Sequence, residues 1–291
     1  MSEHEPVFGR VAVLGLGLMG GSLGLALRAA GGAGTIAGYD KREGVATRAH
    51  GRGAVGVACA SVAEAVAGAD LVVLAAPVLA QRDLLRALAT HLMPSAVVTD
   101  LGSTKVGVVE WAEETLPDPS HFVGGHPMTG SERSGIEAAD AGLYRGRPWC
   151  LTRSARTTSA ALDRVQALVE CVGARPIVVE AAAHDVAVAA ISHLPLVVAT
   201  ALVLAATESP EWDLARTLAA GGFRDTTRVA SGDPNMASDI CLTNTRPLMD
   251  CLDAYLAVLH GLRNQIARQD ANIEGIFTQA KRARDAWVGE R

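Results

Sequence analysis

The stretch VAVLGLGLMG at residues 11–20 decides the fold class of this chain. It opens with four apolar residues, Val11 to Leu14, whose composition is typical of a strand covered on both faces. An apolar pattern of helical period follows from Leu23 to Ala30. The turn between them has the spacing G-x-G-x-x-G. A strand, this glycine pattern and a helix in that order predict the first unit of a fold that binds a dinucleotide.

Each glycine of this turn has its own physical role. Gly15 permits the tight turn, Gly17 lets the backbone approach a pyrophosphate, and Gly20 lets the helix pack closely on the strand. The free N–H groups of the first helical turn, which includes Leu18 and Met19, then face that pyrophosphate. The sequence therefore predicts cofactor contacts at these five positions.

Asp40 stands where a second strand ends, about twenty residues after the last glycine. An acid at this point accepts hydrogen bonds from the adenine ribose hydroxyls and repels a 2′-phosphate. It therefore favours NAD over NADP. Lys41 and Arg42 follow directly and support the opposite interpretation, in which they bind such a phosphate.

Short apolar runs alternate with helical stretches through the first half of the chain, which predicts right-handed strand-helix-strand units and a doubly wound parallel sheet of the Rossmann type. The expected strands are 11–14, 35–39, 71–75, 96–99, 122–124, 148–152 and 177–179. From Ala181 onward the pattern is helical only. We therefore expect a dinucleotide-binding domain at 1–180 and an all-helical domain at 181–291.

Composition limits the kinds of binding partner and the cellular compartment that we expect for this protein. With 49% hydrophobic and 20% charged residues the 291-residue chain has ample material for a core, and its net charge of −5 gives no general attraction to nucleic acid or anionic lipid. The five cysteines form no CxxC pair, which argues against a disulfide framework or a metal site and suits the cytoplasm. The apolar stretch 186–206 is long enough to span a membrane, but Ser192, His193 and Pro195 near its middle favour a helix buried in protein.

Several polar residues stand where a substrate is expected. Ser103 follows a predicted strand, and it either caps the next helix or faces the ligand crevice. His126 lies in a glycine-rich loop after another strand, where core packing explains it poorly. His193, on an apolar helix, is by pattern alone a core histidine. Arg224 and Arg228 follow a diglycine and suit either a carboxylate ligand or an exposed surface.

Taken together, the motifs resemble the prephenate/arogenate dehydrogenase family of tyrosine biosynthesis. The stretches that carry the resemblance are GLGLMGGSLGLAL at 15–27, DLGSTK at 100–105, GGHPMTGSE at 124–132, HD at 184–185, SHLP at 192–195 and GGFRDTTRVASGDP at 221–234. They are ordered along nearly the whole chain. GGHPMTGSE and FRDTTR are much more specific than the glycine pattern.

The resemblance implies an enzyme that uses NAD to oxidise and decarboxylate prephenate to 4-hydroxyphenylpyruvate, or arogenate to tyrosine, and that forms a homodimer through its helical domain. It implies that His126 is the catalytic histidine at the substrate's ring hydroxyl, with Ser103 beside it. Arg228 would bind the ring carboxylate and His193 would line the pocket. Glu132 and Asp225 would form an ionic network with Arg228 at the pocket mouth.

Two other functions are compatible with the pattern. A β-hydroxyacid dehydrogenase has a Rossmann half and a helical half too, but it uses a lysine in its long interdomain helix, and no lysine occurs between Lys105 and Lys281. A nonenzymatic redox sensor that binds NAD would not need His126, His193 and Arg228 together. The sequence does not distinguish prephenate from arogenate as the substrate.

Overall fold

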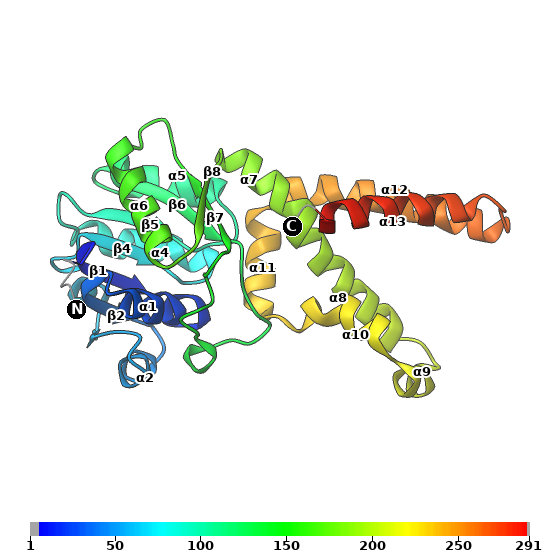
Figure 1. Cartoon of the computed structure of the whole chain (residues 1–291), viewed down its shortest axis with the longest axis horizontal. Helices are drawn as coiled ribbons and strands as arrows, with labels where there is room; N and C mark the ends of the chain where they lie inside the picture. The colour runs from blue at the N-terminus through cyan, green and yellow to red at the C-terminus, as the bar shows by residue number, and fades with distance from the viewer. Residues whose placement is uncertain (1–5, 290–291) are drawn as a thin grey trace. The chain divides into compact units, whose positions relative to one another are not determined.

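The computed structural model describes residues 6–289. By its internal contacts the chain forms two compact units, one ending at Thr245 and the other beginning at Arg246. The first unit contains an eight-stranded sheet in the order β3-β2-β1-β4-β5-β6-β7-β8 (Figure 1). The strands are β1 (Phe8–Leu14), β2 (Ala33–Tyr39), β3 (Val57–Ala58), β4 (Leu71–Leu74), β5 (Val97–Asp100), β6 (Phe122–Pro127), β7 (Pro148–Thr152) and β8 (Arg175–Val178).

Neighbouring strands from β3 to β6 are parallel, so the predicted doubly wound Rossmann sheet is confirmed. The strand order reverses between β1 and β4, and this is the point at which such sheets bind ligands. β7 runs antiparallel to β6, and β8 is parallel to β7. Since only the short 3₁₀ turn η2 (Ile136–Ala138) lies between β6 and β7, no helix carries the chain back to the start of β6.

Six helices belong to the sheet region: α1 (Leu18–Ala30), α2 (Val45–Gly51), α3 (Val62–Val66), α4 (Val78–Ala89), α5 (Val106–Thr115) and α6 (Ser159–Cys171), with the 3₁₀ turn η1 (Pro119–His121). The helical continuation comprises α7 (Ala181–Val188), the π-helical turn η3 (Ala189–His193), α8 (Leu194–Thr207), α9 (Trp212–Leu218), α10 (Gly221–Thr227), the 3₁₀ turn η4 (Arg228–Ser231) and α11 (Pro234–Thr243). The second unit contains α12 (Thr245–Ala267), apart from its first residue, and α13 (Ile273–Gly289). The expected change from strands to helices near residue 180 is therefore present.

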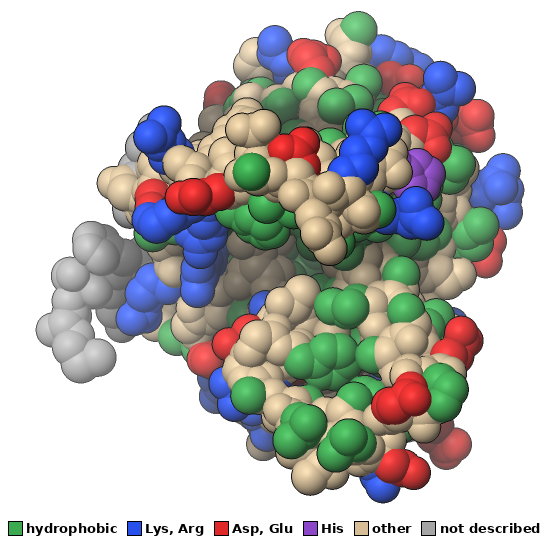
Figure 2. Space-filling model, turned by 90° about the vertical axis from the view of Figure 1, so that its right-hand side faces the viewer, with side chains coloured by type: hydrophobic (Ala, Val, Ile, Leu, Met, Phe, Trp, Pro, Cys, Tyr) green, Lys and Arg blue, Asp and Glu red, His purple; other side chains and the backbone are tan. Residues whose placement is uncertain are grey.

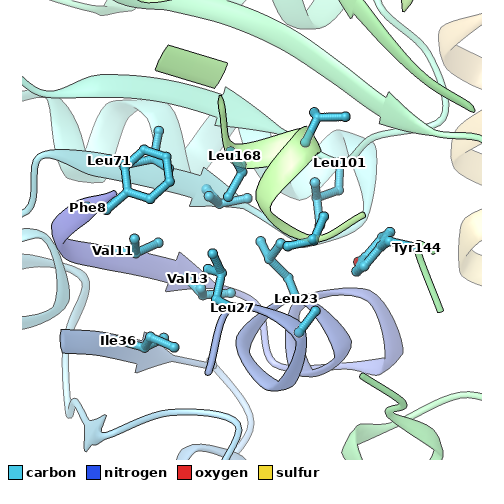
Figure 3. Packing of buried hydrophobic residues seen from close by; sticks show 14 of the residues in the cluster. Phe8, Val11, Val13, Leu23, Leu27, Ile36, Leu71, Leu101, Tyr144 and Leu168 are labelled. Carbon is cyan, nitrogen blue, oxygen red and sulfur yellow. The ribbon is translucent and has the colours of Figure 1, made fainter. Parts of the chain in front are cut away.

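Two apolar clusters cover the two faces of the sheet. Val11 and Val13 belong to one cluster, with side chains of α1 and α6, and Figure 3 shows these side chains turned toward one another. Ala12 and Leu14 belong to the other cluster, with side chains of α4 and α5. Alternate residues of a strand point to opposite faces, so the unbroken apolar run at 11–14 follows from burial on both sides.

The long apolar helix is only partly covered by its own chain. The helical run Ala181–Thr207 is long and apolar enough to cross a membrane. Only 22% of its most apolar 18-residue segment is buried within the chain. Ile191 is 68% exposed and Leu204 is 55% exposed. The single chain therefore leaves much of this helix uncovered, so the predicted burial of the helix in protein requires a contact outside this chain. Figure 2 also shows hydrophobic side chains at the surface among charged ones.

A π-helical turn lies directly before Pro195 at the start of α8. Proline has no N–H group, so the usual bond from residue 195 to the carbonyl of Ile191 cannot form. The preceding N–H, that of Leu194, reaches the carbonyl of Ala189, five residues earlier. π-Helical turns of this kind occur frequently at functional sites. Here the turn ends at His193, whose side chain is fully buried.

Candidate active site

The glycine turn between β1 and α1 has the geometry that a pyrophosphate needs. Gly15 has φ of +102°, and a Cβ there would lie 2.7 Å from the backbone carbonyl of Ala75. A Cβ on Gly20 would lie 1.9 Å from the carbonyl oxygen of Gly15, so only glycine allows α1 to begin this close to β1. The nearest atom to a Cβ built at Gly17 is Nη2 of Arg42, 3.9 Å away, which leaves that face of the turn open. Gly17 is also the N-cap and has no side chain to occupy the N–H groups of the first turn.

Leu18 and Met19 form the first turn of α1, as the sequence suggests. The carbonyl of Met19 accepts a 2.6 Å hydrogen bond from the hydroxyl of Tyr144, a fully buried side chain. This bond ties the helix start to the connection between β6 and β7. Tyr144 was not predicted from the sequence, because nothing in its surroundings marks it.

Asp40 lies at the end of β2 and accepts a 2.8 Å hydrogen bond from the N–H of Leu16, which places its carboxylate beside the glycine turn. Arg42 binds the same carboxylate with its side chain and its backbone N–H. Burial alone would raise the pKa of Asp40, but the bonds from Arg42 and Leu16 outweigh it and lower that pKa. The carboxylate is therefore ionised and can accept hydrogen bonds from a ribose.

A buried ion pair at the end of β5 holds the backbone of β6. Neither Asp100 nor Lys105 exposes any of its side chain, and the ammonium of Lys105 binds the carboxylate of Asp100. Lys105 also donates a 2.8 Å bond to the carbonyl of Gly125, while Asp100 accepts a 2.8 Å bond from the N–H of Gly125. Both backbone groups of Gly125 are thus held, and this fixes the backbone next to His126.

His126 is the penultimate residue of β6 and is partly exposed. Its Nδ1 lies 2.8 Å from Nε2 of His184 on α7, and the Nδ1 of His184 lies 2.8 Å from the carboxylate of Asp185. Burial lowers the pKa of His126 well below its usual range, and the nearby His184, Lys105 and His193 lower it further by disfavouring a second positive charge at this point. His126 is therefore a neutral imidazole at physiological pH, which is the form that accepts a proton.

Asp185 also closes the start of α5. Its carboxylate accepts the N–H groups of Lys105 at 2.8 Å and Val106 at 2.9 Å. Lys105 is the N-cap and has no capping bond from its side chain, and among residues 6–289 no hydrogen bond joins Ser103 to this helix start. Of the two interpretations of Ser103, the capping role thus falls to Asp185. Ser103 remains partly exposed at the strand end.

His193 lies against Asn244 at the end of α11. Its Nδ1 is 3.0 Å from the side-chain nitrogen of Asn244, which also donates a 2.8 Å bond to the carbonyl of Asp185. The other ring nitrogen, Nε2, is buried and has no hydrogen-bond partner among the described residues. Burial lowers the pKa of His193 to about 4. A neutral ring with a free nitrogen near His126 suits a polar ligand.

The remaining predicted residues lie on exposed segments. Arg228, at the start of η4, donates a 3.3 Å bond to Glu132, which lies in the loop after β6. Asp225 instead forms an ion pair with its neighbour Arg224 at 3.1 Å. Among the described residues no ion pair joins Asp225 to Arg228. The structure thus joins Arg228 and Glu132 of the expected ionic network directly. Asp225, the third member, lies about one helical turn before Arg228 in the sequence.

Sequence reasoning missed the residues that support His126. Asp100, Lys105, His184 and Asp185 all lie inside quoted motifs, but spacing alone did not indicate that they meet. Lys105 is one of three lysines in the chain, and a lysine in an apolar segment is a usable signal for a buried ion pair. Asn244 has no such signal.

Comparison with known proteins agrees with this geometry. Residues 23–178 match the prephenate dehydrogenase nucleotide-binding domain, and residues 180–278 match the prephenate dehydrogenase dimerization domain. The chain is 34% identical over 277 residues to a prephenate dehydrogenase of Bacillus subtilis, a match that covers 94% of this chain and 74% of the relative. It is 35% identical over 281 residues to a cyclohexadienyl dehydrogenase of Zymomonas mobilis, which covers 96% of each.

A solved structure is similar over almost the whole length. The prephenate dehydrogenase of Aquifex aeolicus, crystallised with hydroxyphenyl propionate and NAD+, superposes with a TM-score of 0.89 at 33% identity. The match covers 96% of this chain and 98% of that one. Both halves match in the expected order, and the chain therefore belongs to the prephenate dehydrogenase family.

Proposed function

We propose that the protein catalyses the NAD-dependent oxidative decarboxylation of prephenate to 4-hydroxyphenylpyruvate, or of arogenate to tyrosine. The observation that carries the proposal is a neutral, partly exposed His126 at the end of β6, held by His184 and by a backbone clamped through Asp100 and Lys105. A base of this kind, beside a dinucleotide turn at the carboxyl ends of the strands, suits the oxidation of an alcohol.

The cofactor half of the site fits NAD. Gly15, Gly17 and Gly20 with the first turn of α1 would hold the pyrophosphate, and Asp40 would accept bonds from the adenine ribose. When bound, the nicotinamide supplies the acceptor for the hydride. The relative from Aquifex aeolicus was crystallised with NAD+, which supports the same choice here.

His126 would handle the hydroxyl proton. As the ring carbon that bears the hydroxyl loses its hydride, positive charge develops on the oxygen, and His126 draws the proton toward itself. The C–C bond to the ring carboxylate then breaks, carbon dioxide leaves, and the bonding pair makes the ring aromatic. The proton returns to the oxygen, which is now phenolic, so the enzyme ends the cycle neutral at His126.

Substrate binding would fall to the residues around this base. Ser103 would share the contact with the ring hydroxyl, and the free nitrogen of His193 would meet a polar group of the substrate. Arg228 would orient the ring carboxylate with help from Glu132 and Asp225. Arg228 has 59% of its side chain exposed, so it orients this carboxylate more than it neutralises it.

We further propose a cytosolic homodimer whose interface lies in the helical half, with the functional boundary near residue 180. All five cysteines are free, as suits a reducing compartment. The match of residues 180–278 to a dimerization domain and the exposed apolar side chains of α7 and α8 support the dimer.

An absorbance assay for NADH formation tests the proposal. We expect turnover with prephenate or with arogenate, and comparing the two identifies the preferred substrate. We expect none with simple β-hydroxyacids, because these lack the ring whose carboxylate Arg228 would orient and whose loss of carbon dioxide drives the oxidation. NAD binding without turnover on any of these substrates would instead favour the redox-sensor alternative.

A further inference from the structure

The hydrogen-bond chain behind His126 determines which of its two ring nitrogens is the base. We propose that Asp185 and His184 are positioning residues that hold His126 in the tautomer with hydrogen on Nδ1, so that Nε2 accepts the substrate's hydroxyl proton. The use of Nε2 in catalysis rests on the proposed function. The tautomer itself does not, because it is fixed by contacts within the chain.

The hydrogen-bond chain begins at the carboxylate of Asp185, which can only accept hydrogen bonds. Asp185 is 2% exposed and accepts two backbone N–H groups, at Lys105 and Val106, which stabilise its ionised form. Its Oδ1 is also 2.8 Å from Nδ1 of His184. Since an ionised carboxylate has no hydrogen to donate, Nδ1 of His184 must donate the hydrogen in this contact.

The contact between His184 and His126 then determines the tautomer of His126. A neutral imidazole has one donor and one acceptor nitrogen, so a hydrogen on Nδ1 of His184 leaves its Nε2 as the acceptor. That Nε2 lies 2.8 Å from Nδ1 of His126. Nδ1 of His126 must therefore donate, and the neutral ring keeps Nε2 free.

The competing arrangement places a second proton on His184. The ring would then donate from both nitrogens, and His126 would have the opposite tautomer, with a hydrogen on Nε2. His184 is only 2% exposed, and it lies near the rings of His126 and His193, with the buried ammonium of Lys105 acting on His126. A further buried cation among these groups is unfavourable, although Asp185 lies beside it.

The arrangement has a use during hydride transfer. As the hydroxyl proton moves to Nε2, the imidazolium that forms at His126 is bonded through Nδ1 to His184, and His184 is bonded to the charge of Asp185. No proton has to move along the chain for this stabilisation. When carbon dioxide has left, the same proton returns from Nε2 to the phenolic oxygen, which keeps atoms and charge balanced.

Nitrogen-15 NMR of the histidine rings in the full-length protein tests the tautomer without substrate. We expect His126 to show hydrogen on Nδ1 and a bare Nε2, and His184 to show the same pattern. A His126→Gln sample identifies the signals of His126 among those of the eight histidines by their loss. A hydrogen on Nε2 of His126, or hydrogens on both nitrogens of His184 near neutral pH, would overturn the proposal.

Two substitutions at one position separate positioning from packing. His184→Leu removes the acceptor, so we expect the hydrogen of His126 to shift to Nε2 and kcat to fall about 100-fold with little change in KM. His184→Gln places a carbonyl oxygen near the position of Nε2, so we expect the wild-type tautomer and a kcat within about 10-fold of wild type. Equal losses in the two variants would also contradict the proposal.

Thr243→Val is the matched control. It breaks the 2.9 Å contact between the hydroxyls of Thr243 and Thr104, beside the start of α5. The hydrogen-bond chain of Asp185, His184 and His126 stays intact. We expect the wild-type ring signals in this variant. A wild-type protein with the predicted tautomer but no turnover on either substrate would contradict the proposed function alone.

Discussion

Arg42 grips the carboxylate of Asp40 at two points, with Nε bonded to Oδ1 and Nη2 bonded to Oδ2, each at 2.9 Å. The bond from the N–H of Leu16 holds the carboxylate in place beside the glycine turn. The acid that favours NAD and the cation that favours NADP are therefore one bonded pair. The choice between NAD and NADP depends on which of these two side chains contacts the adenine ribose.

The first prediction follows from this pair. Asp40→Ser removes the repulsion toward a 2′-phosphate and frees Arg42, so we expect weaker use of NAD and relatively better use of NADP. Arg42→Ala leaves Asp40 in place, so we expect the preference for NAD to increase. The ratio of kcat/KM for the two cofactors measures both effects. A wild-type enzyme that works better with NADP would show that Arg42, rather than Asp40, decides the choice.

The second prediction concerns stability at low pH. Burial lowers the pKa of His193 from 6.5 to about 4, so between these values the unfolded chain binds a proton that the folded chain does not. The free energy of unfolding therefore falls as pH falls through this range, by about 1.4 kcal/mol per pH unit for one such group. The lowered pKa of His126 acts in the same direction.

Urea unfolding at pH 6.5 and at about pH 5 measures this loss. His193→Asn removes one titrating ring, so we expect the variant to lose less stability than the wild type over the same interval. An identical loss in both proteins would mean that His193 does not titrate in this range.

The third prediction concerns the ring carboxylate. Arg228→Ala removes its guanidinium, so we expect the KM for substrate to rise about 10-fold with a smaller change in kcat. The effect is modest because the side chain is largely exposed. Arg224→Ala is the matched control, since Arg224 lies one turn earlier and pairs with Asp225. If only the Arg224 variant loses affinity, the carboxylate is bound there instead.

The fourth prediction is the homodimer. Ile191 and Leu204 are more than half exposed on an apolar helix, which a second copy of the chain would cover. We expect light scattering to give the mass of two 30.1 kDa chains at micromolar concentration. Leu204→Glu should shift the mass toward one chain, whereas Met93→Glu, at an exposed position before β5, should not. A monomeric wild type would contradict the dimer.

Local patterns were enough to predict the sheet. The strand-glycine-helix unit at 11–30 and the later apolar runs placed seven strands. A central strand such as β4 is apolar at every position because both faces are buried, whereas β8 ends in apolar residues although it is largely exposed. The two-residue strand β3 was missed, since Val57 and Ala58 are too short a run to distinguish from a loop. The reversal at β7 was missed because strand direction depends on the connection before it.

The site was only partly predictable, for a different reason. His126 stood out because a histidine between glycines and a proline at a strand end has no packing role. His184 and Asp185 were visible only as a short motif, because their role depends on α7 lying against the start of α5, and no local spacing encodes that contact. Asp239, whose carboxylate accepts the N–H of Leu79 at 3.0 Å and so closes the start of α4, was missed on the same ground.

The kcat of a His126→Asn variant, measured by NADH formation at saturating substrate and NAD, tests the central claim most directly. Asparagine keeps a hydrogen-bonding group but cannot accept the proton, so we expect kcat to fall about 100-fold or more while KM changes little. NAD binding should be unchanged, because the glycine turn and Asp40 are untouched. A variant with near-normal kcat would remove His126 from the chemistry and contradict the account.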